Sequence, residues 1–522
     1  MADKSHDRLD QVYSGSLMAD LDITQPDAVM VKVDCDRSLA KELNSYFTFT
    51  MPNFKYTPAY KNKIWDGKIR LFNLFTQSMY AGLVEPLIKF AKDRGYSYSF
   101  TPRTYQKPSN ALISDFIENL PIQANGSTIK PHDYQVEAVL HSLGHSRALL
   151  VSPTGSGKSL ILYLLCRWIL ETHNTGKLLI IVPTTSLVSQ MLADFREYAK
   201  LDTWKADRNI HTIMAGKDKD TNKRIIISTW QSIYKQPEQW FDEFVGVFGD
   251  EVHLFSAKSL TGIMTKAKNT DYRIGTTGTL SGMQIHQFVI EGLFGPVYNT
   301  TTTKKLIDKD LLSSINIDCL KLQYTPEEIK KTKRMEYQDE IRFVVTHKGR
   351  NKFIKNLCNS LTGNTLVLFN FVELQGKPLY ELIVNDSNKS IYFIHGETDV
   401  ETREEIRKIV DKGTDSILIA SYGTCSTGIN IRNINNIVFA SPSKSVIRVL
   451  QSIGRGLRKT ETKSKMKLFD IADDLSYKSY ENHGMKHLEQ RFKIYTNEGF
   501  PFKIVPIQLP KETNDENPVQ IN

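Results

Sequence analysis

The chain has 522 residues, of which 40% are hydrophobic and 24% charged, a composition typical of folded globular proteins and not of disordered or membrane chains. This length exceeds what one hydrophobic core supports, so we expect about three domains. Lys and Arg outnumber Asp and Glu by 67 to 58, and the net charge of +9 favours a polyanionic partner without establishing one. Five widely spaced cysteines and an N-terminus without a signal pattern predict a cytoplasmic protein with no zinc site, disulfide framework or membrane role.

The N-terminal part of the chain is predicted to hold an arm and a small domain. Residues 1–28 contain six aspartates and few large apolar groups, so we expect a flexible acidic arm. Residues 29–121 show the pattern of an α+β accessory domain, with a strand at 29–34 and a helix from Ser38 to about Phe47. Its segment KYTPAYKNKIWDGKIRLFN mixes basic and aromatic residues, which suits phosphate contacts and base stacking. The candidate DNA-binding residues there are Lys61, Lys63, Trp65, Lys68 and Arg70, although Trp65 could equally belong to a hairpin core.

From residue 129 onward, short β-branched runs alternate with helical stretches, which predicts parallel sheets covered by helices. The runs are ALLVSP, KLLIIVP, RIIIST, VGVFGDE and YRIGTTG, followed by TLVLFN, SIYFIHG, SILIAS, NIVFAS and MKLFDIA. Between the two groups, the charged segment from Pro326 to Arg350 predicts a helical linker. We therefore expect two α/β domains in series, at 122–310 and 311–508, and a flexible tail at 509–522. One very wide sheet is the less economical alternative.

A phosphate-binding loop is predicted where ALLVSP runs into TGSGKS and a long apolar helix. Backbone N–H groups and the helix N-terminus would bind a polyphosphate, Lys158 would contact the β- and γ-phosphates, and Ser159 would give an oxygen to Mg²⁺. Ser152 stands where the strict pattern has glycine. The predicted ATP-binding residues of the loop are Thr154, Gly155, Ser156, Gly157, Lys158 and Ser159.

Two further groups complete the predicted nucleotide site. Asp250 and Glu251 end the apolar strand VGVFGDE, where Asp250 would hold Mg²⁺ and Glu251 would orient and deprotonate the attacking water. Arg455 and Arg458, three residues apart in QSIGRGLR, share one side of a helix and could reach across a cleft to the γ-phosphate. A solvated basic face is the alternative for this pair.

The order of SPTGSGKS, PTTSLVSQM, STWQS, DEVH, TTGTL, STGIN and QSIGRGLRK resembles that of superfamily 2 helicases between Ile129 and Lys459. The resemblance implies two tandem RecA-like domains that use ATP and Mg²⁺ and contact the nucleic-acid backbone. His132 and Asn430 stand where many relatives carry arginine and aspartate. The resemblance implies that Gln135 recognises adenine and that Gly428 approaches the nucleotide. It implies that hydrolysis is coupled to domain motion by His253, Thr276, Thr279 and Gln451. The implied DNA contacts are Thr184, Thr185, Thr229, Trp230 and Gln231. A packed core position is the alternative for Trp230, and ordinary loop packing is the alternative for His253 and the TTGT segment.

The segment KYTPAYKNKIWDGKIRLFN with the following AGLVEPLIKF resembles the accessory domain of UvsW-type phage DNA helicases. This resemblance implies an ATP-dependent helicase or translocase acting on branched DNA in phage recombination and repair, in the cytoplasm of an infected cell. The implied activities are fork regression, Holliday-junction branch migration and D-loop or R-loop unwinding. Expected partners are forked DNA, RNA–DNA hybrids and phage recombination or replication proteins, with the chain acting as a monomer. The open alternatives are an RNA helicase, the motor subunit of a restriction system, and a non-motor binding protein.

Overall fold

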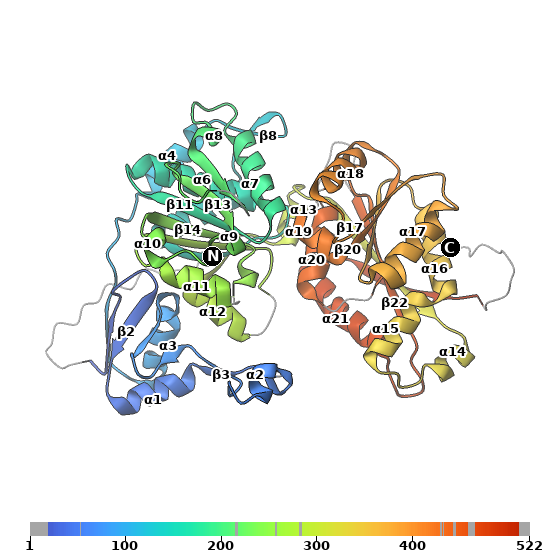
Figure 1. The fold of residues 1–522 in the computed structure, drawn as a ribbon, viewed down its shortest axis with the longest axis horizontal. Coiled ribbons are helices and arrows are strands. Elements are labelled where there is room, and N and C mark those ends of the chain that lie inside the picture. The colour runs from blue at the N-terminus through green and yellow to red at the C-terminus, as the bar shows by residue number, and fades with distance from the viewer. Residues whose placement is uncertain are drawn as a thin grey trace.

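The computed structural model describes residues 19–52, 54–214, 218–255, 258–280, 284–428, 431, 433–441, 445–457 and 465–510. These residues form two seven-stranded parallel sheets, one five-stranded mixed sheet and two two-stranded antiparallel sheets. Figure 1 shows the two large sheets with their helices side by side and the smaller N-terminal unit below the first of them. The predicted architecture of two tandem RecA-like domains and a small α+β accessory domain is confirmed.

The accessory domain is built on a sheet of order β5-β6-β2-β1-β7 with helices α1 and α3. The strand β1 lies inside this sheet, antiparallel to β2 and parallel to β7. Its Leu21 and Ile23 are completely buried, so the prediction of a flexible arm through residue 28 is wrong for this stretch, where a short alternating pattern fills one core face. Residues 1–18 lie outside the described residues. The bounds are β1 (Leu21–Thr24), β2 (Met30–Asp34), α1 (Arg37–Tyr46), β5 (Phe72–Asn73), β6 (Ser78–Tyr80), the 3-10 helix η2 (Ala81–Leu83), α3 (Val84–Arg94) and β7 (Tyr98–Thr101).

A small lobe projects from this domain and carries the basic-aromatic segment (Figure 1). We call residues 48–70 the basic lobe; its elements are β3 (Thr48–Thr50), η1 (Phe54–Tyr56), α2 (Pro58–Lys61) and β4 (Lys68–Arg70). Gly67 has a φ of +80°, and a Cβ there would lie 2.2 Å from Cδ2 of Phe54. The ring of Phe54 therefore packs directly on the turn, which glycine alone permits.

The first RecA-like domain has the strand order β12-β13-β11-β14-β15-β10-β16. Alternate residues of β11 enter different hydrophobic clusters, with Leu178 and Ile180 on one face of the sheet and Leu179 and Ile181 on the other. Both faces are therefore covered, which explains why the strands read as continuous apolar runs. The bounds are β10 (Arg147–Val151), α6 (Lys158–Thr172), β11 (Lys177–Val182), α7 (Thr185–Tyr198), α8 (Ala206–Asn209), β12 (Ile210–Ile213), β13 (Ile225–Thr229), α9 (Trp230–Ile233), α10 (Glu238–Phe241), β14 (Phe244–Asp250), η3 (Val252–Leu254), α11 (Lys258–Lys266), β15 (Tyr272–Thr277), α12 (Gln284–Phe294), β16 (Val297–Asn299) and α13 (Thr303–Asp308).

The boundary predicted between the accessory and first RecA-like domains is too late in the chain. Helix α4 (Asn110–Asn119) packs against α5 (Asp133–His145) and α6, and its Ile113 and Ile117 are buried in the core of the first RecA-like domain. The short hairpin of β8 (Ile122–Ala124) and β9 (Ser127–Ile129) follows it. The elements that cover the apolar face of this helix lie further along the chain, in α5 and α6.

The second RecA-like domain has the strand order β19-β20-β18-β21-β22-β17-β23. The segment from Pro326 to Arg350 is helical as predicted, but it is a connection within this domain and not a linker, because Arg350 is fully buried and its Nε donates to Asp473 at 2.7 Å. The bounds are β17 (Ser314–Gln323), α14 (Pro326–Lys331), α15 (Tyr337–Thr346), α16 (Lys348–Ser360), β18 (Thr365–Phe369), the π-helix η4 (Val372–Gly376), α17 (Lys377–Val384), β19 (Ser390–Ile394), α18 (Val400–Lys412), β20 (Ser416–Ser421), α19 (Tyr422–Gly428), β21 (Asn436–Phe439), α20 (Val446–Gly456), β22 (Lys465–Asp474), α21 (His483–Glu498) and β23 (Phe502–Gln508).

The second RecA-like domain ends slightly later in the chain than predicted. Leu509 follows β23, is 2% exposed and donates its N–H to the Gln323 carbonyl, so the domain extends one residue into the predicted tail. Residues 511–522 lie outside the described residues. Within the described part of the chain, no helix has the length and apolar character needed to cross a bilayer.

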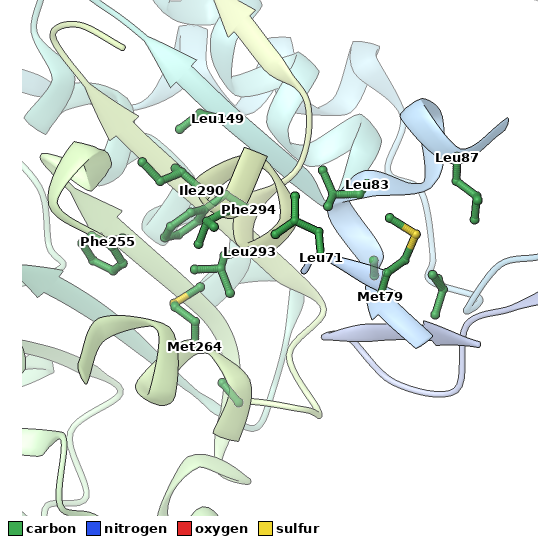
Figure 2. Packing of buried hydrophobic residues seen from close by; sticks show 14 of the residues in the cluster. Leu71, Met79, Leu83, Leu87, Leu149, Phe255, Met264, Ile290, Leu293 and Phe294 are labelled. Carbon is green, nitrogen blue, oxygen red and sulfur yellow. The ribbon is translucent and has the colours of Figure 1, made fainter. Parts of the chain in front are cut away.

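The accessory domain and the first RecA-like domain share one hydrophobic core (Figure 2). Leu83 of η2 lies in the same cluster as Ile290, Leu293 and Phe294 of α12, on the side of the accessory domain that faces this helix. All four residues are buried. The backbones approach so closely that a Cβ on Gly82 would lie 2.0 Å from the Glu291 carbonyl oxygen, while one on Gly292 would lie 2.8 Å from Cβ of Tyr80. The ring of Phe49 in the basic lobe also stacks on Phe288 of α12, with centroids 5.3 Å apart. This interface is a core and not a surface contact.

Candidate functional site

The loop between β10 and α6 has the backbone of a phosphate cradle. Gly155 and Gly157 both adopt left-handed conformations, with φ of +86° and +81°. A Cβ on Gly157 would lie 2.4 Å from the side-chain nitrogen of Gln135, so a larger residue there would displace that side chain. Helix α6 begins directly after this turn, which leaves its first N–H groups directed at the loop. The predicted loop residues are therefore together at the carboxyl end of β10.

Gln135, which is predicted to recognise adenine, lies against this loop, although the two are about twenty residues apart in the chain. Its Nε2 donates to the Ser156 carbonyl at 2.8 Å, and its Oε1 accepts the N–H of His132 at 2.9 Å. The hydroxyl of Tyr134, which the sequence does not single out, donates to the same Ser156 carbonyl at 2.8 Å. The start of α5 thus braces the loop with two side chains.

The acidic pair lies at the carboxyl end of β14, the second strand from β10 in the sheet. Asp250 is 8% exposed and accepts a hydrogen bond from the Thr276 hydroxyl at 2.8 Å. Glu251 adopts a left-handed conformation with φ of +52°, an uncommon and mildly strained backbone for a residue other than glycine. Its Oε1 lies 4.0 Å from Nζ of Lys158, which also donates to the Ser152 carbonyl at 3.3 Å. The loop lysine and the acidic pair therefore converge.

The pKa of Asp250 is raised to about 6, chiefly by burial and then by the neighbouring Glu251 carboxylate, while Lys158 acts in the opposite direction. The cause is that two carboxylates in a dry site repel each other and lose solvation. A bound cation would relieve both effects, so the chemistry of this pair suits Mg²⁺, a cation that prefers carboxylate oxygens.

This raised pKa predicts a pH-dependent stability. Because the folded protein holds the Asp250 proton more tightly than the unfolded chain, this carboxyl lowers the stability of the nucleotide-free protein as pH rises toward and past 6. Replacing Asp250 with asparagine should therefore stabilise the protein, and the gain should grow by about 1 kcal/mol between about pH 5 and about pH 7.5. Thermal or urea unfolding of both proteins without nucleotide measures it. A gain that is constant or larger at low pH would contradict the assignment.

The residues predicted to couple hydrolysis to motion form a chain of contacts behind the acidic pair. Nδ1 of His253 lies 3.3 Å from Oε2 of Glu251 and 3.1 Å from the hydroxyl of Thr277. Thr277 in turn donates to the Thr279 carbonyl at 3.0 Å. His253 and Thr276 thus contact the acidic pair, Thr279 takes part through its backbone, and Thr277 is an addition that the same TTGT string contains. Their coupling role stays a prediction.

The predicted metal-binding hydroxyl of Ser159 has a protein neighbour in this structure. Its Oγ lies 2.9 Å from the hydroxyl of Tyr198 at the end of α7. The sequence does not single out Tyr198, since it belongs to no local pattern. Coordination of a metal by Ser159 would require this hydroxyl to turn from Tyr198 or to be shared with it.

The second RecA-like domain touches the phosphate-binding loop. A Cβ on Gly454 of α20 would lie 2.5 Å from Cβ of Thr154, and one on Gly155 would lie 2.9 Å from Cδ2 of Leu312. Helix α20 thus approaches the loop at the residue before Arg455. The side chains of Arg455 and Gln451 are outside the description, as is all of Arg458.

The remaining second-domain candidate is Gly428, the last residue of α19, and α19 packs beside α7 of the first domain. Its predicted approach to the nucleotide stays a prediction.

The first-domain candidates for DNA contact lie at the carboxyl ends of β11 and β13, which are neighbours in the sheet. Thr184 caps α7, accepting the N–H of Leu187 at 3.4 Å, and Thr185 is the first residue of that helix. Thr229 is 4% exposed, with its hydroxyl 3.0 Å from that of Ser232. The ring of Trp230 is half-buried against the core, whereas Gln231 is exposed.

The basic lobe presents lysines and apolar side chains to solvent. Lys61, Lys63 and Lys68 are exposed. Trp65 is half-buried, and its indole N–H donates to the Lys68 carbonyl at 2.8 Å, so part of this side chain closes the turn. Arg70 is bound to Asp66 at 2.5 Å, which neutralises one of the predicted charges.

Two exposed apolar residues of the same lobe are not singled out by the sequence. Tyr56 is 76% exposed and Ile64 is 79% exposed, so both are free to contact a ligand. Phe54 and Tyr60, by contrast, pack against each other, with ring centroids 4.7 Å apart. No local sequence pattern distinguishes the packed aromatic residues from the exposed one.

Three protein families match parts of this chain. Residues 20–101 match the N-terminal domain of the DNA helicase UvsW, residues 128–282 match the res subunit of type III restriction enzymes, and residues 349–460 match the helicase conserved C-terminal domain. The ATP-dependent DNA helicase uvsW of Enterobacteria phage T4 is 33% identical over 498 residues, which cover 92% of this chain and 98% of that protein. A putative ATP-dependent RNA helicase of Acanthamoeba polyphaga mimivirus is 23% identical over a region that covers 82% of this chain and 86% of that protein.

Solved structures give the same picture. The crystal structure of T4 UvsW matches at 32% identity with a TM-score of 0.50, covering 94% of this chain and 100% of that chain. A fragment of a putative HsdR subunit of a type I restriction enzyme from Vibrio vulnificus shares the fold, at 17% identity and a TM-score of 0.55, covering 84% of this chain and 76% of that chain.

Two RecA-like domains that meet at a phosphate-binding loop, with an acidic pair beside that loop, together with these matches define an ATP-dependent helicase of superfamily 2. The similarity to the phage T4 protein extends through the accessory domain and over nearly the whole chain. The chain therefore belongs to the UvsW family of ATP-dependent DNA helicases.

Proposed function

We propose that this helicase acts on branched DNA, where it regresses forks, drives branch migration of Holliday junctions and unwinds D-loops or R-loops. The observation that carries the proposal is the basic lobe, which is joined to the first RecA-like domain through a shared core. A lobe held in this way keeps a constant position relative to the motor domain. It can therefore engage one arm of a junction while the motor moves along another.

The ATP site would work through the residues already described. Bound Mg²⁺–ATP would supply the transferable phosphoryl group and the cation that neutralises its charge. Lys158 and the loop backbone would hold the phosphates, and Asp250 and Ser159 would hold the metal. Glu251 would take a proton from the attacking water while His253 keeps its carboxylate oriented.

The second domain would add the remaining charge. Arg455 and Arg458 would approach the γ-phosphate when α20 closes on Thr154, so hydrolysis would depend on the arrangement of the domains. Gly428 and Gln451 would report the same closure. The contact between Gly454 and Thr154 supports this role for α20.

DNA would run along the carboxyl edges of both RecA-like sheets. Thr184, Thr185, Thr229 and Gln231 would contact the phosphate backbone, which predicts binding without sequence preference and with strong salt dependence. On the basic lobe, the exposed lysines would contact a neighbouring arm, and Tyr56 and Ile64 would pack against bases exposed at the branch point.

An RNA helicase is the alternative that one relative's name suggests. The test is the ATPase rate on single-stranded, duplex, forked and four-way-junction DNA and on structured RNA. Greatest stimulation by forked and four-way DNA supports the proposal. Equal or greater stimulation by RNA would refute it.

Substitutions in the basic lobe test the origin of branch preference. Deleting the accessory domain would open the shared core, so we choose surface changes, replacing Lys61, Lys63 and Lys68 with glutamine and Tyr56 with alanine. We expect a roughly tenfold or greater loss of preference for forks over linear duplex, since up to three phosphate contacts are lost, with activity on single strands retained. The readout is the ratio of ATPase stimulation by the two DNAs.

The matched control replaces three exposed lysines of the same domain, Lys41, Lys89 and Lys92, and adds no other charge change. This control should keep the fork preference. If both variants lose it equally, the effect comes from net charge and the basic lobe has no specific role.

A further inference from the structure

A cluster of lysines and tyrosines lies at the carboxyl end of β22, outside every segment so far connected with DNA. Nζ of Lys333 lies 5.0 Å from the ring centroid of Tyr477, and that of Lys478 lies 5.7 Å from the same ring. Nζ of Lys486 lies 5.3 Å from the ring centroid of Tyr480. We call these five residues the tyrosine–lysine surface. They come from three separate segments: the connection between α14 and α15, the loop after β22, and α21.

The loop that carries the two tyrosines is rigidly built. Tyr477 and Tyr480 exchange two backbone hydrogen bonds, at 2.9 and 3.0 Å, around a tight turn in which Lys478 takes a left-handed φ of +52°. Asn482 accepts the N–H of Leu475 at 3.1 Å and donates to the buried carboxylate of Glu340 at 2.8 Å. The turn is thus held at both ends.

Glu340 also orders the helix that follows. It is 3% exposed and accepts the backbone N–H groups of His483 and Gly484 at 3.0 and 2.7 Å. These are the first N–H groups of α21, so the carboxylate occupies that helix N-terminus. Lys486, one turn further along α21, is therefore fixed relative to the loop.

The charge of the surface is weakly balanced. Among the described residues, Lys333, Lys478 and Lys486 have no carboxylate within ion-pair distance, and each ammonium group lies over an aromatic ring. The nearby carboxylates are Glu481 and Glu489, with Asp474 already bound to Lys321 at 2.8 Å.

A lysine ammonium group lies over each of the two tyrosine rings, so the rings hold these ammonium groups in place. Three ammonium groups that form no ion pair with a carboxylate of the described residues suit the phosphodiester backbone.

The position of the surface continues the predicted DNA path. All strands of this sheet are parallel, so the loop after β22 shares an edge with η4, which follows β18, and with α19, which follows β20. At this edge Arg350 joins the ends of β22 and β21, since it binds Asp473 at the end of β22 and donates to the Ala440 carbonyl after β21. In Figure 1, α14 and α15 lie on the same lower side of the molecule as α2 and β3 of the basic lobe.

We propose that the tyrosine–lysine surface binds the phosphodiester backbone of a DNA arm where it leaves the second RecA-like domain. The contact is independent of base sequence. It rests on the family's DNA helicase activity and not on the proposed preference for branched DNA. Each lysine contributes by displacing counterions from a phosphate, and the tyrosines hold the ammonium groups in place.

The test replaces Lys333, Lys478 and Lys486 together with glutamine in the full-length protein. The matched control replaces Lys352, Lys408 and Lys412, three exposed lysines on α16 and α18 of the same domain, so that the net charge change is equal. Affinity for a forked DNA with long arms is measured over a series of salt concentrations. Thermal unfolding of both variants checks that they fold.

We expect the slope of log affinity against log salt to become shallower by up to about 2.7 in the test variant, or about 0.9 for each phosphate contact, and to stay unchanged in the control. Shortening the arms should remove the difference between the two proteins. Replacing Tyr477 with alanine should give a smaller change in the same direction, and replacing it with phenylalanine should give none.

An unchanged slope in the test variant, or an equal change in the control, overturns the proposal. Fork preference is scored separately in the same assays. A test variant with a shallower slope and intact fork preference supports DNA binding by the tyrosine–lysine surface, independently of the role of the basic lobe. If the wild-type protein shows no fork preference, only the branched-DNA proposal is affected.

Discussion

Replacing Lys158 with alanine is expected to lower DNA-stimulated ATP hydrolysis by at least about 10²–10³-fold, the usual effect of removing one preorganised charge from a phosphoryl-transfer site. The ammonium group lies between the phosphate-binding loop and Glu251, where it offsets the charges of the buried Asp250 and the partly buried Glu251. Its loss removes both a phosphate contact and this balance. DNA affinity should stay close to the wild-type value, because the predicted DNA contacts are on other loops.

Steady-state ATPase assays with and without DNA, together with DNA binding in the absence of nucleotide, measure both effects. The exposed Lys200 provides a control, since its replacement by alanine changes the net charge equally. Normal turnover by the Lys158 variant would show that this loop is not the hydrolytic site. A large loss of DNA affinity would show that the loop also carries nucleic-acid contacts.

Replacing Gly454 with alanine should lower ATP hydrolysis by about 10²-fold, as expected when catalytic groups are displaced by about 1 Å. The added methyl group would lie 2.5 Å from Cβ of Thr154, so α20 would have to move away from the phosphate-binding loop. Arg455, the next residue, would move with it. Nucleotide binding by the first domain should change much less than turnover, which nucleotide titration and ATPase assays separate.

Two further variants identify the cause of that loss. Gly262 in α11 has open space around it, so its replacement by alanine should leave the rate unchanged. The three atoms that crowd Gly454 all belong to the Thr154 side chain, so the double variant with Thr154→Gly should recover part of the rate. Additive losses in this double-mutant cycle would contradict the proposed contact.

The strands of both RecA-like sheets could be predicted because they are buried on both faces and appear as short apolar runs. The elements that escape prediction lack this property. Strand β1 has only two buried residues among aspartates, and α4 packs on a domain that begins after it. The helices between β17 and β18 look solvated because their buried charges, Glu340 and Arg350, have partners more than a hundred residues away.

The nucleotide site divides in the same way. Lys158, Asp250 and Gln135 could be predicted because each belongs to a local pattern attached to a strand or helix end. Tyr134 and Tyr198 could not, since their contacts with Ser156 and Ser159 depend on tertiary packing. Trp65 shows a further limit, because composition alone does not reveal which aromatic residue closes a turn and which remains exposed.

The close packing of Gly82 and Gly292 across the shared core has a consequence for how such helicases diversify. The accessory domain packs against backbone atoms of α12, and any side chain at either glycine would collide with the opposite segment. The domain is therefore not a unit that can be exchanged independently. A chimaera that exchanges residues 20–101 between relatives would need to carry a matching α12 with it. Substitutions in η2 and α12 are therefore expected to be inherited together, while the exposed face of the basic lobe remains free to vary with the DNA it meets.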